Sequence, residues 1–519
     1  MAAVLMFCYL RVAGTVPVTS DGAGNALQAW AMLHGNPLLR GWWVTDVSFY
    51  TTELPQYLLV EAVAGLRPEV VHICAAMTYT MLVLLAAFVA RGRTQGTAGV
   101  ICALIAAGVM LAPEPGAAAA VLLYCPDHVG TAVPVLLVLL LLDWARPVWW
   151  VPVGVGLLLA LAIVGDPLAE VVGVLPLLAL CLARVGAGLL RRKVPVRSLW
   201  YEISLACAAA AAVLAAKAIN RLIVALGGFS TNKGNWSLVS PSVLRANVPQ
   251  AAHDFLSLFG ADVAGAPGGL QQAFAAVHLV GAALVLVAVV VAGWWLLRSL
   301  WSRGPDGTAV ASADLVTSLL VVAIVCNFAA YVFMYQIRHI FDEHEIGPVL
   351  ALGAALAGRQ LGRPLLALRP RTLRTGLVSA LVAGLACYCV MLGFAAARPQ
   401  AAPNSASVAA WLTRHQLRNG VGAYWQASSV MLDTHGAISI GLVTPDAGGL
   451  ASWHWEANTR LVNSALSSAN FLITTSGDSV TPARAELAFG RPARVYRYQD
   501  YTIMVWHKNI LRALGRPVS

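Results

Sequence analysis

Residues 271–297 read QQAFAAVHLVGAALVLVAVVVAGWWLL, and Arg298 follows directly. The stretch carries no acidic or basic side chain except the neutral imidazole of His278. A membrane-spanning helix needs about 20 mostly apolar residues, so this segment is long enough to cross a bilayer. Because lipid offers the backbone no hydrogen-bond partners, a helix is the form in which such a segment satisfies its own peptide groups.

Similar apolar segments recur along the chain. Of its 519 residues, 59% are hydrophobic and 11% are charged, whereas a soluble domain is about a quarter charged. The fold predicted from about eleven such segments is a mainly α, polytopic transmembrane protein. The segments are 1–17, 67–90, 95–112, 130–142, 148–165, 168–190, 200–223, 271–297, 313–335, 346–358 and 376–396.

Basic residues gather in alternate linkers between these segments. With a cytoplasmic N-terminus, every inside linker contains Arg: 91–94, 143–147, 191–199, 298–310 and 359–375. Lys and Arg remain on the cytoplasmic side of membrane proteins, so this pattern predicts the orientation of a multi-pass plasma-membrane protein. It also accounts for the net charge of +10 without a nucleic-acid partner. The outside linkers are then 18–66, 113–129, 166–167, 224–270 and 336–345.

The tail after the last apolar segment has a different composition. It opens with a Pro/Asn/Ser stretch, and residues 406–417 have the pattern of an amphipathic helix. Short alternating runs then favour a small α/β domain. These runs are 429–433, 437–443, 470–475, 494–498 and 501–506. We therefore predict a membrane domain over 1–396, with long outer loops at 18–66 and 224–270, and an extracytoplasmic domain over 397–519.

Polar side chains concentrate in the outside linkers. The first begins Thr19-Ser20-Asp21-Gly22-Ala23-Gly24-Asn25. Ser20 or Asp21 can cap the helix that follows, but capping accounts for one acidic residue only. In the second linker, the Asp127-His128 pair either forms a turn and cap, faces a phosphate or contributes to a metal site. Further polar candidates in the outside linkers are Asp46, Tyr50, Glu53 and Asp166.

The fifth outside linker is the most densely charged of them. Residues 335–345 read YQIRHIFDEHE. The guanidinium of Arg338 matches phosphate oxygens, although an Arg–carboxylate pair on a solvated turn is the alternative. His339, Glu343 and His344 have ligand-like spacing without an HExxH motif. The sequence therefore assigns no metal ligands, and a loosely bound divalent cation at Asp21 or Asp127 is favoured over zinc.

The apolar segments themselves contain few ionisable residues. His278 and Arg11 are the main exceptions. Ion-coupled transporters carry ionisable groups near the bilayer midplane. Their scarcity in this chain counts against a transporter, a flippase or a channel.

Taken together, these features resemble the GT-C superfamily of membrane glycosyltransferases, which includes protein mannosyltransferases and family-39-like bacterial proteins. Asp21 follows the first apolar segment, and Asp127 with His128 lies in the next outer loop. Arg338 precedes a membrane segment that opens with Gly347-Pro348, and a further domain follows the last segment. Gly22 stands directly after Asp21, where the first loop of the family commonly has a second acidic residue.

The resemblance implies a hexosyltransferase that moves sugar from a polyprenyl-phosphate donor to a glycan, lipid or protein acceptor at the outer membrane surface. Asp21 and Asp127 would be catalytic, with Asp21 as the general base. Arg338, His128 and His339 would bind the donor phosphate. Contacts to the substrate are expected from Asn25, Asp46, Tyr50, Glu53 and Asp166. The alternatives are a transporter or flippase of a lipid-linked solute, and a non-catalytic assembly protein, which the missing second acidic residue favours.

Overall fold

The computed structural model describes residues 1–114, 116–124, 128–190, 195–232, 237–266, 268–301, 314–335, 337 and 342–514. The described chain divides into two compact units. The first, which we name the helical unit, comprises Met1–Ala13, Ala75–Ala218 and Asn235–Arg398. The second, the mixed unit, joins Gly14–Cys74 and Ile219–Gly234 to the tail, Pro399–Ser519.

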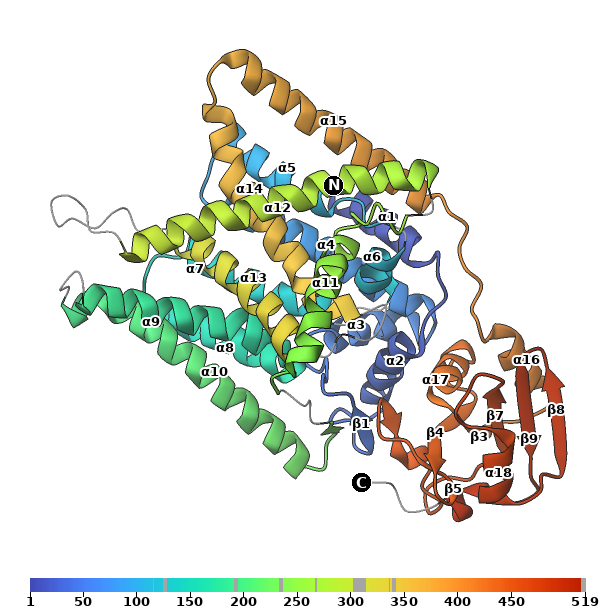
Figure 1. Cartoon of the computed structure of the whole chain (residues 1–519). Helices are drawn as coiled ribbons and strands as arrows, with labels where there is room; N and C mark the ends of the chain where they lie inside the picture. Colours follow the sequence, from blue (N-terminus) through green and yellow to red (C-terminus); the bar gives the residue numbers. More distant parts are fainter. Residues whose placement is uncertain are drawn as a thin grey trace. The chain divides into compact units, whose positions relative to one another are not determined.

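The predicted apolar segments overlap helices, and most of their residues belong to the helical unit (Figure 1). Its α-helices are α1 (Ala2–Ala13), α4 (Glu69–Arg91), α5 (Gly96–Met110), α6 (Ala117–Ala119), α7 (Ala132–Trp144), α8 (Trp150–Gly165), α9 (Leu175–Leu190), α10 (Trp200–Ala225), α11 (Pro241–Leu258), α12 (Gly269–Trp301), α13 (Leu315–Met334), α14 (Gly347–Ala367) and α15 (Arg371–Ala396). The short helical turns are η1 (Ala120–Tyr124), η2 (Val129–Thr131), η3 (Glu170–Val174), η4 (Val196–Leu199) and η5 (Asp342–Ile346). Residues 69–74 of α4 and 219–225 of α10 belong to the mixed unit, and the rest of both helices to the helical unit.

Several of these helices can cross a membrane. Among the described residues, six are long and apolar enough by length and composition. They are Glu69–Arg91, Glu170–Leu190, Val196–Ala225, Gly269–Leu300, Leu315–Met334 and Arg371–Ala396. The chain is therefore a multi-pass membrane protein, and its mainly α fold class is confirmed.

Helices α5 and α14 pack closely through small residues. A Cβ at Gly358 would lie 2.3 Å from the carbonyl oxygen of Cys102, and one at Gly362 would lie 2.5 Å from its sulfur. These glycines stand four residues apart, so both face α5 from the same side of α14. In lipid, where apolar area alone does not drive association, such a small-residue face lets backbones approach and gain van der Waals contact.

An ionic network is centred on Arg359, in the second half of α14. The Arg359 Nη2 atom is 2.8 Å from Asp143 Oδ1, at the end of α7, and 2.6 Å from Asp314 Oδ2, at the N-cap of α13. Its Nη1 atom donates to the carbonyl of Val89 in α4. One guanidinium therefore joins four helices. A Cβ at Gly92, which has φ +52°, would lie 2.5 Å from Arg359 Nη1, so glycine is required there.

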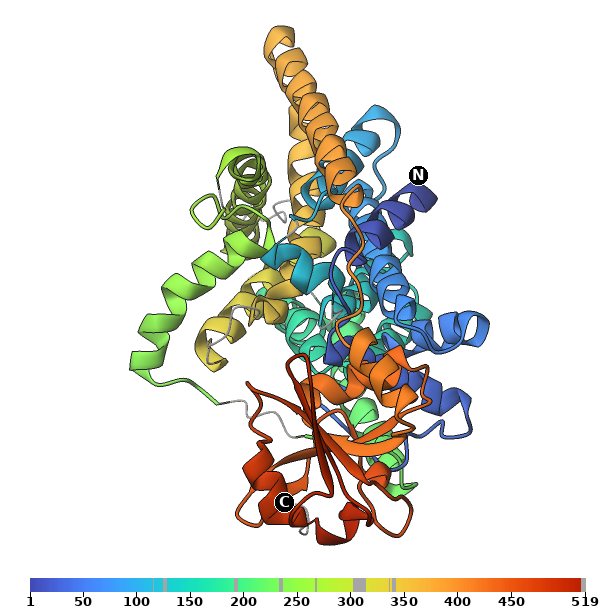
Figure 2. The same cartoon turned by 90° about the vertical axis from the view of Figure 1, so that its right-hand side faces the viewer.

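The tail of the mixed unit is built around a sheet with strand order β5-β4-β3-β7-β9-β8 in the described chain (Figures 1 and 2). Its strands are β3 (Asn419–Gly422), β4 (Ser439–Asp446), β5 (Gly449–Ser452), β7 (Phe471–Thr475), β8 (Arg494–Tyr498) and β9 (Tyr501–Val505). β3 pairs in parallel with β4 and β7, and the other pairs are antiparallel. The tail also contains α16 (Ala406–Arg414), α17 (Tyr424–Asp433), α18 (Pro482–Phe489), η6 (Thr459–Leu461) and η7 (Ile510–Ala513).

Side chains of the sheet alternate between two cores. Phe471 and Ile473 pack with residues of α16 and α17, whereas Leu472 between them packs with residues of α18. This is the period of two that a strand imposes. The tail is therefore an α/β fold with a core on each face of its sheet.

The predicted strand at 429–433 is wrong, because these residues form the end of α17. A short apolar run such as Val430-Met431-Leu432 cannot be assigned to helix or strand by periodicity alone. The amphipathic helix at 406–417 is confirmed in α16, and the runs at 437–443, 470–475, 494–498 and 501–506 overlap strands.

A second small sheet ties distant parts of the mixed unit together. β1 (Trp42–Val44), in the first long loop, pairs in parallel with β2 (Ser230–Thr231) and antiparallel with β6 (Ala457–Asn458) of the tail. The first loop also contains α2 (Ser20–Leu33) and α3 (Leu54–Ala64). Loop and tail therefore share backbone hydrogen bonds as well as side-chain contacts.

Glu61 of α3 provides a test of this packing. Its side chain is 2% exposed, and neither carboxyl oxygen has a hydrogen-bond partner among the described residues. Burial raises the pKa of Glu61 to about 9. The folded protein therefore holds a proton that the unfolded chain releases above its ordinary pKa, and the stability falls as pH rises through that window.

We expect Glu61→Gln, which is neutral at every pH, to be more stable than the wild type by about 3 kcal/mol at pH 7 and by little at pH 4. Melting temperatures of the detergent-solubilised protein across this range measure the difference. Glu486→Gln, at an exposed position of α18, is the control. A constant difference between Glu61→Gln and the wild type at all pH values would contradict the burial of a neutral carboxyl.

Candidate functional site

The start of α2 is fixed by its cap and by α17. Thr19 is the N-cap, and its hydroxyl accepts a hydrogen bond from the Gly22 amide. The Ser20 hydroxyl donates to the carbonyl of Trp425, 2.7 Å away. Neither Ser20 nor Asp21 caps the helix, so the capping interpretation of these residues is wrong. Asp21 lies in the first turn, where the helix dipole favours a negative charge.

Asp21 contacts Tyr424 of the tail, and Tyr424 also contacts Glu456. The hydroxyl of Tyr424, the first residue of α17, is hydrogen-bonded to Asp21 Oδ1 and lies 2.5 Å from Glu456 Oε2. Burial, together with the Glu456 and Asp21 carboxylates, raises the pKa of Tyr424 well above its usual value. The phenol therefore keeps its proton at physiological pH and is a donor to the two carboxylates.

Glu456 is held against α2 in an unfavourable backbone conformation. Its φ is +44°, in the left-handed region, which costs a residue with a Cβ about 1–2 kcal/mol. Its side chain is nevertheless buried, at 5% exposure. A Cβ at Gly24 would lie 2.5 Å from Glu456 Oε2. The glycine at position 24 therefore leaves the space that the glutamate occupies, and strain of this kind is typical of functional sites.

Two buried amides continue the same helix. Asn25 and Gln28 follow Asp21 by four and seven residues, so the three side chains lie on one face of α2. Both amides are at most 2% exposed, and their carbonyl oxygens have no hydrogen-bond partner among the described residues. An unpaired buried polar atom costs about 1–3 kcal/mol, so these oxygens are suited to hold a water or a ligand donor.

The other predicted residues of the first loop lie elsewhere in the mixed unit. Asp46 follows β1 and is partly exposed, and Glu53 is buried at the N-cap of α3. Tyr50 donates its hydroxyl to the Pro37 carbonyl and packs against Phe229. Tyr50 is therefore held by contacts to residues of the first and fourth outside linkers.

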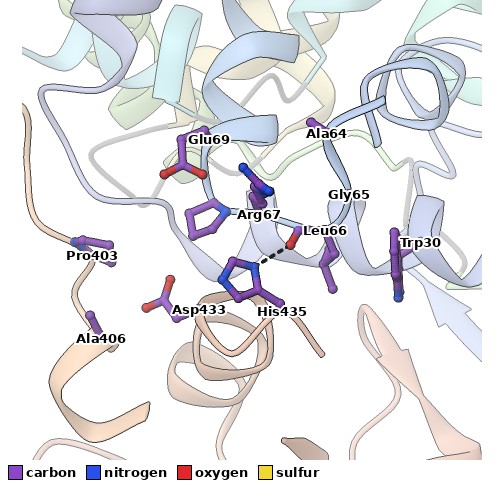
Figure 3. A pocket seen from close by; sticks show the side chains of 11 residues that line it. Trp30, Ala64, Gly65, Leu66, Arg67, Glu69, Pro403, Ala406, Asp433 and His435 are labelled. Atoms are coloured by element: carbon purple, nitrogen blue, oxygen red, sulfur yellow. Dashed lines mark hydrogen bonds between the residues drawn. The ribbon is translucent and has the colours of Figure 1, made fainter. Parts of the chain in front are cut away.

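An open groove of about 670 Å³ lies elsewhere in the mixed unit (Figure 3). Arg67 and Glu69 line one side, and Asp433 and His435 at the end of α17 line the other. His435 Nδ1 lies 2.7 Å from the Leu66 carbonyl. Charged side chains together with the indole of Trp30 are a lining suited to polar, hydroxylated ligands.

A second polar cluster lies within the helical unit around His128. Its Nδ1 atom is 2.9 Å from Asp166 Oδ2, which also accepts a hydrogen bond from the Thr131 hydroxyl. The other Asp166 oxygen accepts from the Leu168 amide. Asp166 is completely buried, so its evident role is to fix the ring of His128. Because Nδ1 faces a carboxylate, the Nε2 atom on the other side of the ring is the one that can act as an acceptor or a ligand.

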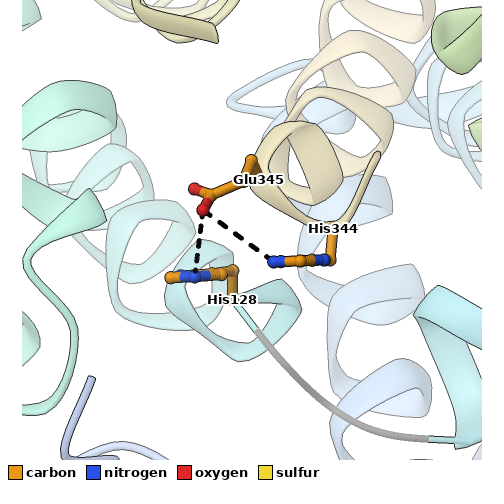
Figure 4. A group of neighbouring side chains, drawn as sticks. All are labelled: His128, His344 and Glu345. Atoms are coloured by element: carbon orange, nitrogen blue, oxygen red, sulfur yellow. Dashed lines mark ion pairs between the residues drawn. The ribbon is translucent and has the colours of Figure 1, made fainter. Parts of the chain in front are cut away.

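That Nε2 atom faces two residues of η5 (Figure 4). It lies 3.8 Å from Glu345 Oε1, and His344 Nε2 lies at the same distance from that oxygen. One ligand atom from each of these three residues falls within 4.8 Å of the others. Tetrahedral zinc with bonds of about 2.0–2.1 Å separates its ligands by about 3.4 Å, so a small adjustment would bring them to a divalent cation.

Three predicted site residues lie outside the described residues. They are Asp127, Arg338 and His339. Three residues have zinc-like spacing in the sequence: His339, Glu343 and His344. In the structure, His344 is grouped with His128 and not with Glu343. Glu343 instead accepts a hydrogen bond from the Ser257 hydroxyl, at 3.2 Å.

Sequence patterns did not indicate two tail residues of this site: Tyr424, which contacts Asp21, and Glu456, which contacts Tyr424. Tyr424 and Glu456 come from segments more than 400 residues after Asp21, and neither has a local motif. The signal that was present is the run of small residues from Gly22 to Gly24. Two glycines at the start of a helix are unfavourable for helix formation and indicate a close approach by another part of the chain.

Comparison with known proteins rests on structure. No protein-family model matches the sequence, and no curated protein matches it. The crystal structure of ArnT from Cupriavidus metallidurans bound to undecaprenyl phosphate is similar, with a TM-score of 0.50 and 14% identity over 99% of this chain and 97% of that one. The crystal structure of the Archaeoglobus fulgidus oligosaccharyltransferase in complex with Zn and sulfate has a TM-score of 0.50 and 10% identity, over 94% of this chain and 68% of that one.

The two structures are those of an ArnT and an oligosaccharyltransferase, and the similarity extends over nearly all of this chain. At such low identity, what is shared is the arrangement of the backbone. The fold expected from the resemblance is thereby confirmed, because the chain shares its backbone arrangement with ArnT and with the oligosaccharyltransferase.

Proposed function

We propose that the protein is a membrane glycosyltransferase that moves a sugar from a polyprenyl-phosphate carrier to an acceptor outside the cytoplasm. The observation that carries the proposal is the part-buried hydrogen bond between Asp21 and Tyr424 at the start of α2, in a chain with the GT-C fold. Undecaprenyl phosphate in the ArnT structure supports a lipid phosphate as the donor carrier. The orientation, in the plasma membrane with a cytoplasmic N-terminus, is supported by the basic linkers.

In this proposal Asp21 is the general base. The acceptor hydroxyl gives its proton to Asp21 while its oxygen attacks the anomeric carbon, and the bond to the lipid phosphate breaks. Asn25, with its unpaired buried oxygen, accepts a hydrogen bond from a further hydroxyl of the substrate. Asp46, Tyr50 and Glu53 remain weaker candidates for substrate contacts. Asp127 remains a proposed second catalytic carboxylate.

The donor phosphate is assigned to basic groups. Arg338 and His339 are proposed for it on the sequence pattern, and His128 on the outward-facing Nε2 atom. Asp166, proposed from the sequence as a substrate contact, would act by orienting His128. A divalent cation held by His128, His344 and Glu345 would supply positive charge for phosphate oxygens.

The proposed cation site gives a prediction that does not depend on turnover. Two imidazoles and one carboxylate suit zinc or manganese better than magnesium or calcium. We expect the purified protein to bind Zn²⁺ in calorimetric titrations, and Asp166→Asn to weaken binding by about 10- to 100-fold through loss of the orienting contact. His344→Ala should weaken it further, whereas His507→Ala, at an exposed tail position, should not change it. Equal affinity in all variants would assign the zinc to other residues.

A transfer assay tests the function itself. Full-length protein in nanodiscs is mixed with undecaprenyl-phosphate hexoses and pentoses and a cell-envelope extract. Mass spectrometry then measures the undecaprenyl phosphate released and the sugar gained by acceptors. Release of the lipid phosphate with a new glycosidic bond is expected. Sugar-lipid movement across vesicles without release would favour a flippase, and no reaction with any donor would favour an assembly protein.

A further inference from the structure

The phenol of Tyr424 lies between two carboxylates that are 435 positions apart in the sequence. It contacts Asp21 Oδ1 and lies 2.5 Å from Glu456 Oε2. A tyrosine hydroxyl carries one proton, so it can donate fully to one carboxylate at a time. The geometry therefore offers the same proton two alternative acceptors.

The approach of Glu456 is maintained by separate features of the chain. Its backbone is in the left-handed region, and Gly24 leaves room for its carboxylate. The Ser20 hydroxyl bonds to the backbone of α17 next to Tyr424, which fixes the two helix starts together. A hydrogen bond that only tied the loop to the tail would not require a strained, buried glutamate.

We infer that Tyr424 and Glu456 are positioning residues for Asp21, with the Tyr424 proton moving its hydrogen bond from Asp21 to Glu456 as the reaction proceeds. The inference rests on the proposed function, because it assigns Asp21 as the base. It also supplies, from the tail, the second acidic residue whose place in the first loop is occupied by Gly22.

The exchange balances without a further reactant. Before the reaction Asp21 is ionised, and the Tyr424 hydroxyl donates to its Oδ1 atom. When the acceptor oxygen bonds to the anomeric carbon, its proton passes to the other oxygen of Asp21 and the lipid phosphate leaves with the bonding electrons. Tyr424 then donates to the ionised Glu456, and the proton stays on the Asp21 oxygen that received it. Neither Tyr424 nor Glu456 gains or loses a proton.

Glu456 thus offers the Tyr424 hydroxyl a charged acceptor in both states of Asp21. Once protonated, Asp21 presents a neutral oxygen to the phenol, whereas the Glu456 carboxylate still accepts a charge-assisted hydrogen bond, which is about twice as strong. Without Glu456, protonation of Asp21 would therefore weaken the hydrogen bond of Tyr424 and be less favourable. The effect falls on the chemical step and not on the affinity for substrate. It should therefore appear in kcat, with KM for donor and acceptor nearly unchanged.

The test uses full-length variants in the transfer assay. We expect Tyr424→Phe and Glu456→Ala each to lower kcat by about 10- to 100-fold. Glu456→Gln, which keeps an acceptor oxygen but not its charge, should lower kcat by less than Glu456→Ala does. The double variant Tyr424→Phe/Glu456→Ala should be no slower than Tyr424→Phe, because residues that act through one contact are not additive. Gly24→Ala, which crowds the Glu456 carboxylate, should resemble Glu456→Ala.

Two matched controls remove the same groups elsewhere in the tail. Tyr498→Phe removes a phenol oxygen from β8, and Glu486→Ala removes an exposed carboxylate from α18. Both should retain wild-type kcat. Melting temperatures of all variants separate a loss of positioning from a loss of folding, and Tyr424→Phe remains informative if Glu456→Ala is unstable.

The outcomes separate the inference from the function on which it rests. If the wild type transfers sugar and Asp21→Asn does not, while Tyr424→Phe and Glu456→Ala keep full kcat, the inference is wrong and the function stands. Multiplicative losses in the double variant, or a rise in KM alone, also overturn it. If the wild type releases no lipid phosphate from any donor, the function and the inference both fail.

Discussion

Asp21→Asn is expected to lower kcat for sugar transfer by about 10²- to 10⁴-fold, the usual contribution of a general base. Asparagine has the same shape and still accepts a hydrogen bond from Tyr424, so the contact between α2 and α17 should persist. It cannot take a proton from the acceptor hydroxyl. The expected result is therefore an inactive protein with a near-normal melting temperature and unchanged zinc binding.

The control for this variant is Asp500→Asn, which removes a carboxylate from the exposed turn between β8 and β9. Initial rates of undecaprenyl phosphate release measure both variants at saturating donor and acceptor. Asp500→Asn should match the wild type. Turnover by Asp21→Asn within a few-fold of the wild type would remove Asp21 from the base role, whatever the identity of the sugar.

Arg359→Met is expected to cause the largest loss of stability. Its guanidinium pairs with Asp143 and Asp314, and the Asp143 side chain is only 7% exposed. Removing one partner of a buried ion pair leaves an uncompensated charge and costs about 3–5 kcal/mol. Because the same guanidinium joins four helices, the loss should affect the whole helical unit. Thermal unfolding in detergent, followed by tryptophan fluorescence, measures it.

Two further variants identify the cause of that loss. Arg371→Met removes an exposed charge at the start of α15 and should leave the melting temperature unchanged. Arg359→Met/Asp143→Leu removes the stranded carboxylate as well and should recover much of the stability, since apolar replacement of a whole buried pair is often neutral. Equal losses in the single and double variants would indicate that packing, not charge, is responsible.

The helical architecture was predictable because lipid imposes a simple rule on sequence. A segment such as 271–297 has no acceptable structure in a bilayer except a helix, so composition alone identifies it. The tail obeys no such rule. The apolar run Val430-Met431-Leu432 fits either a strand or a helix, and its place in α17 is decided by packing in the core beside the sheet.

Individual residues of the candidate site were predicted from the sequence, but the contacts between them were not. Asp21, His128 and Asp166 were identified as polar residues at the ends of apolar segments. Their partners depend on tertiary structure: Asp166 turns to His128, and Glu345 rather than Glu343 faces the imidazoles. Tyr424 and Glu456 carry no sequence signal, because the contact with Asp21 forms only when loop and tail pack together.

The small sheet of β1, β2 and β6 bears on how the protein is made. β1 is synthesised early, but its antiparallel partner β6 lies more than 400 residues later. At about 5–20 residues per second, the ribosome needs roughly 20–90 s to travel from Asp21 to Glu456. During that time the tail residues that pair with the first loop have not been synthesised, and Asp21 has neither Tyr424 nor Glu456 beside it. A nascent chain interrupted before the tail therefore has the proposed base but not its hydrogen-bonded setting, so completion of synthesis itself becomes the step that assembles the site.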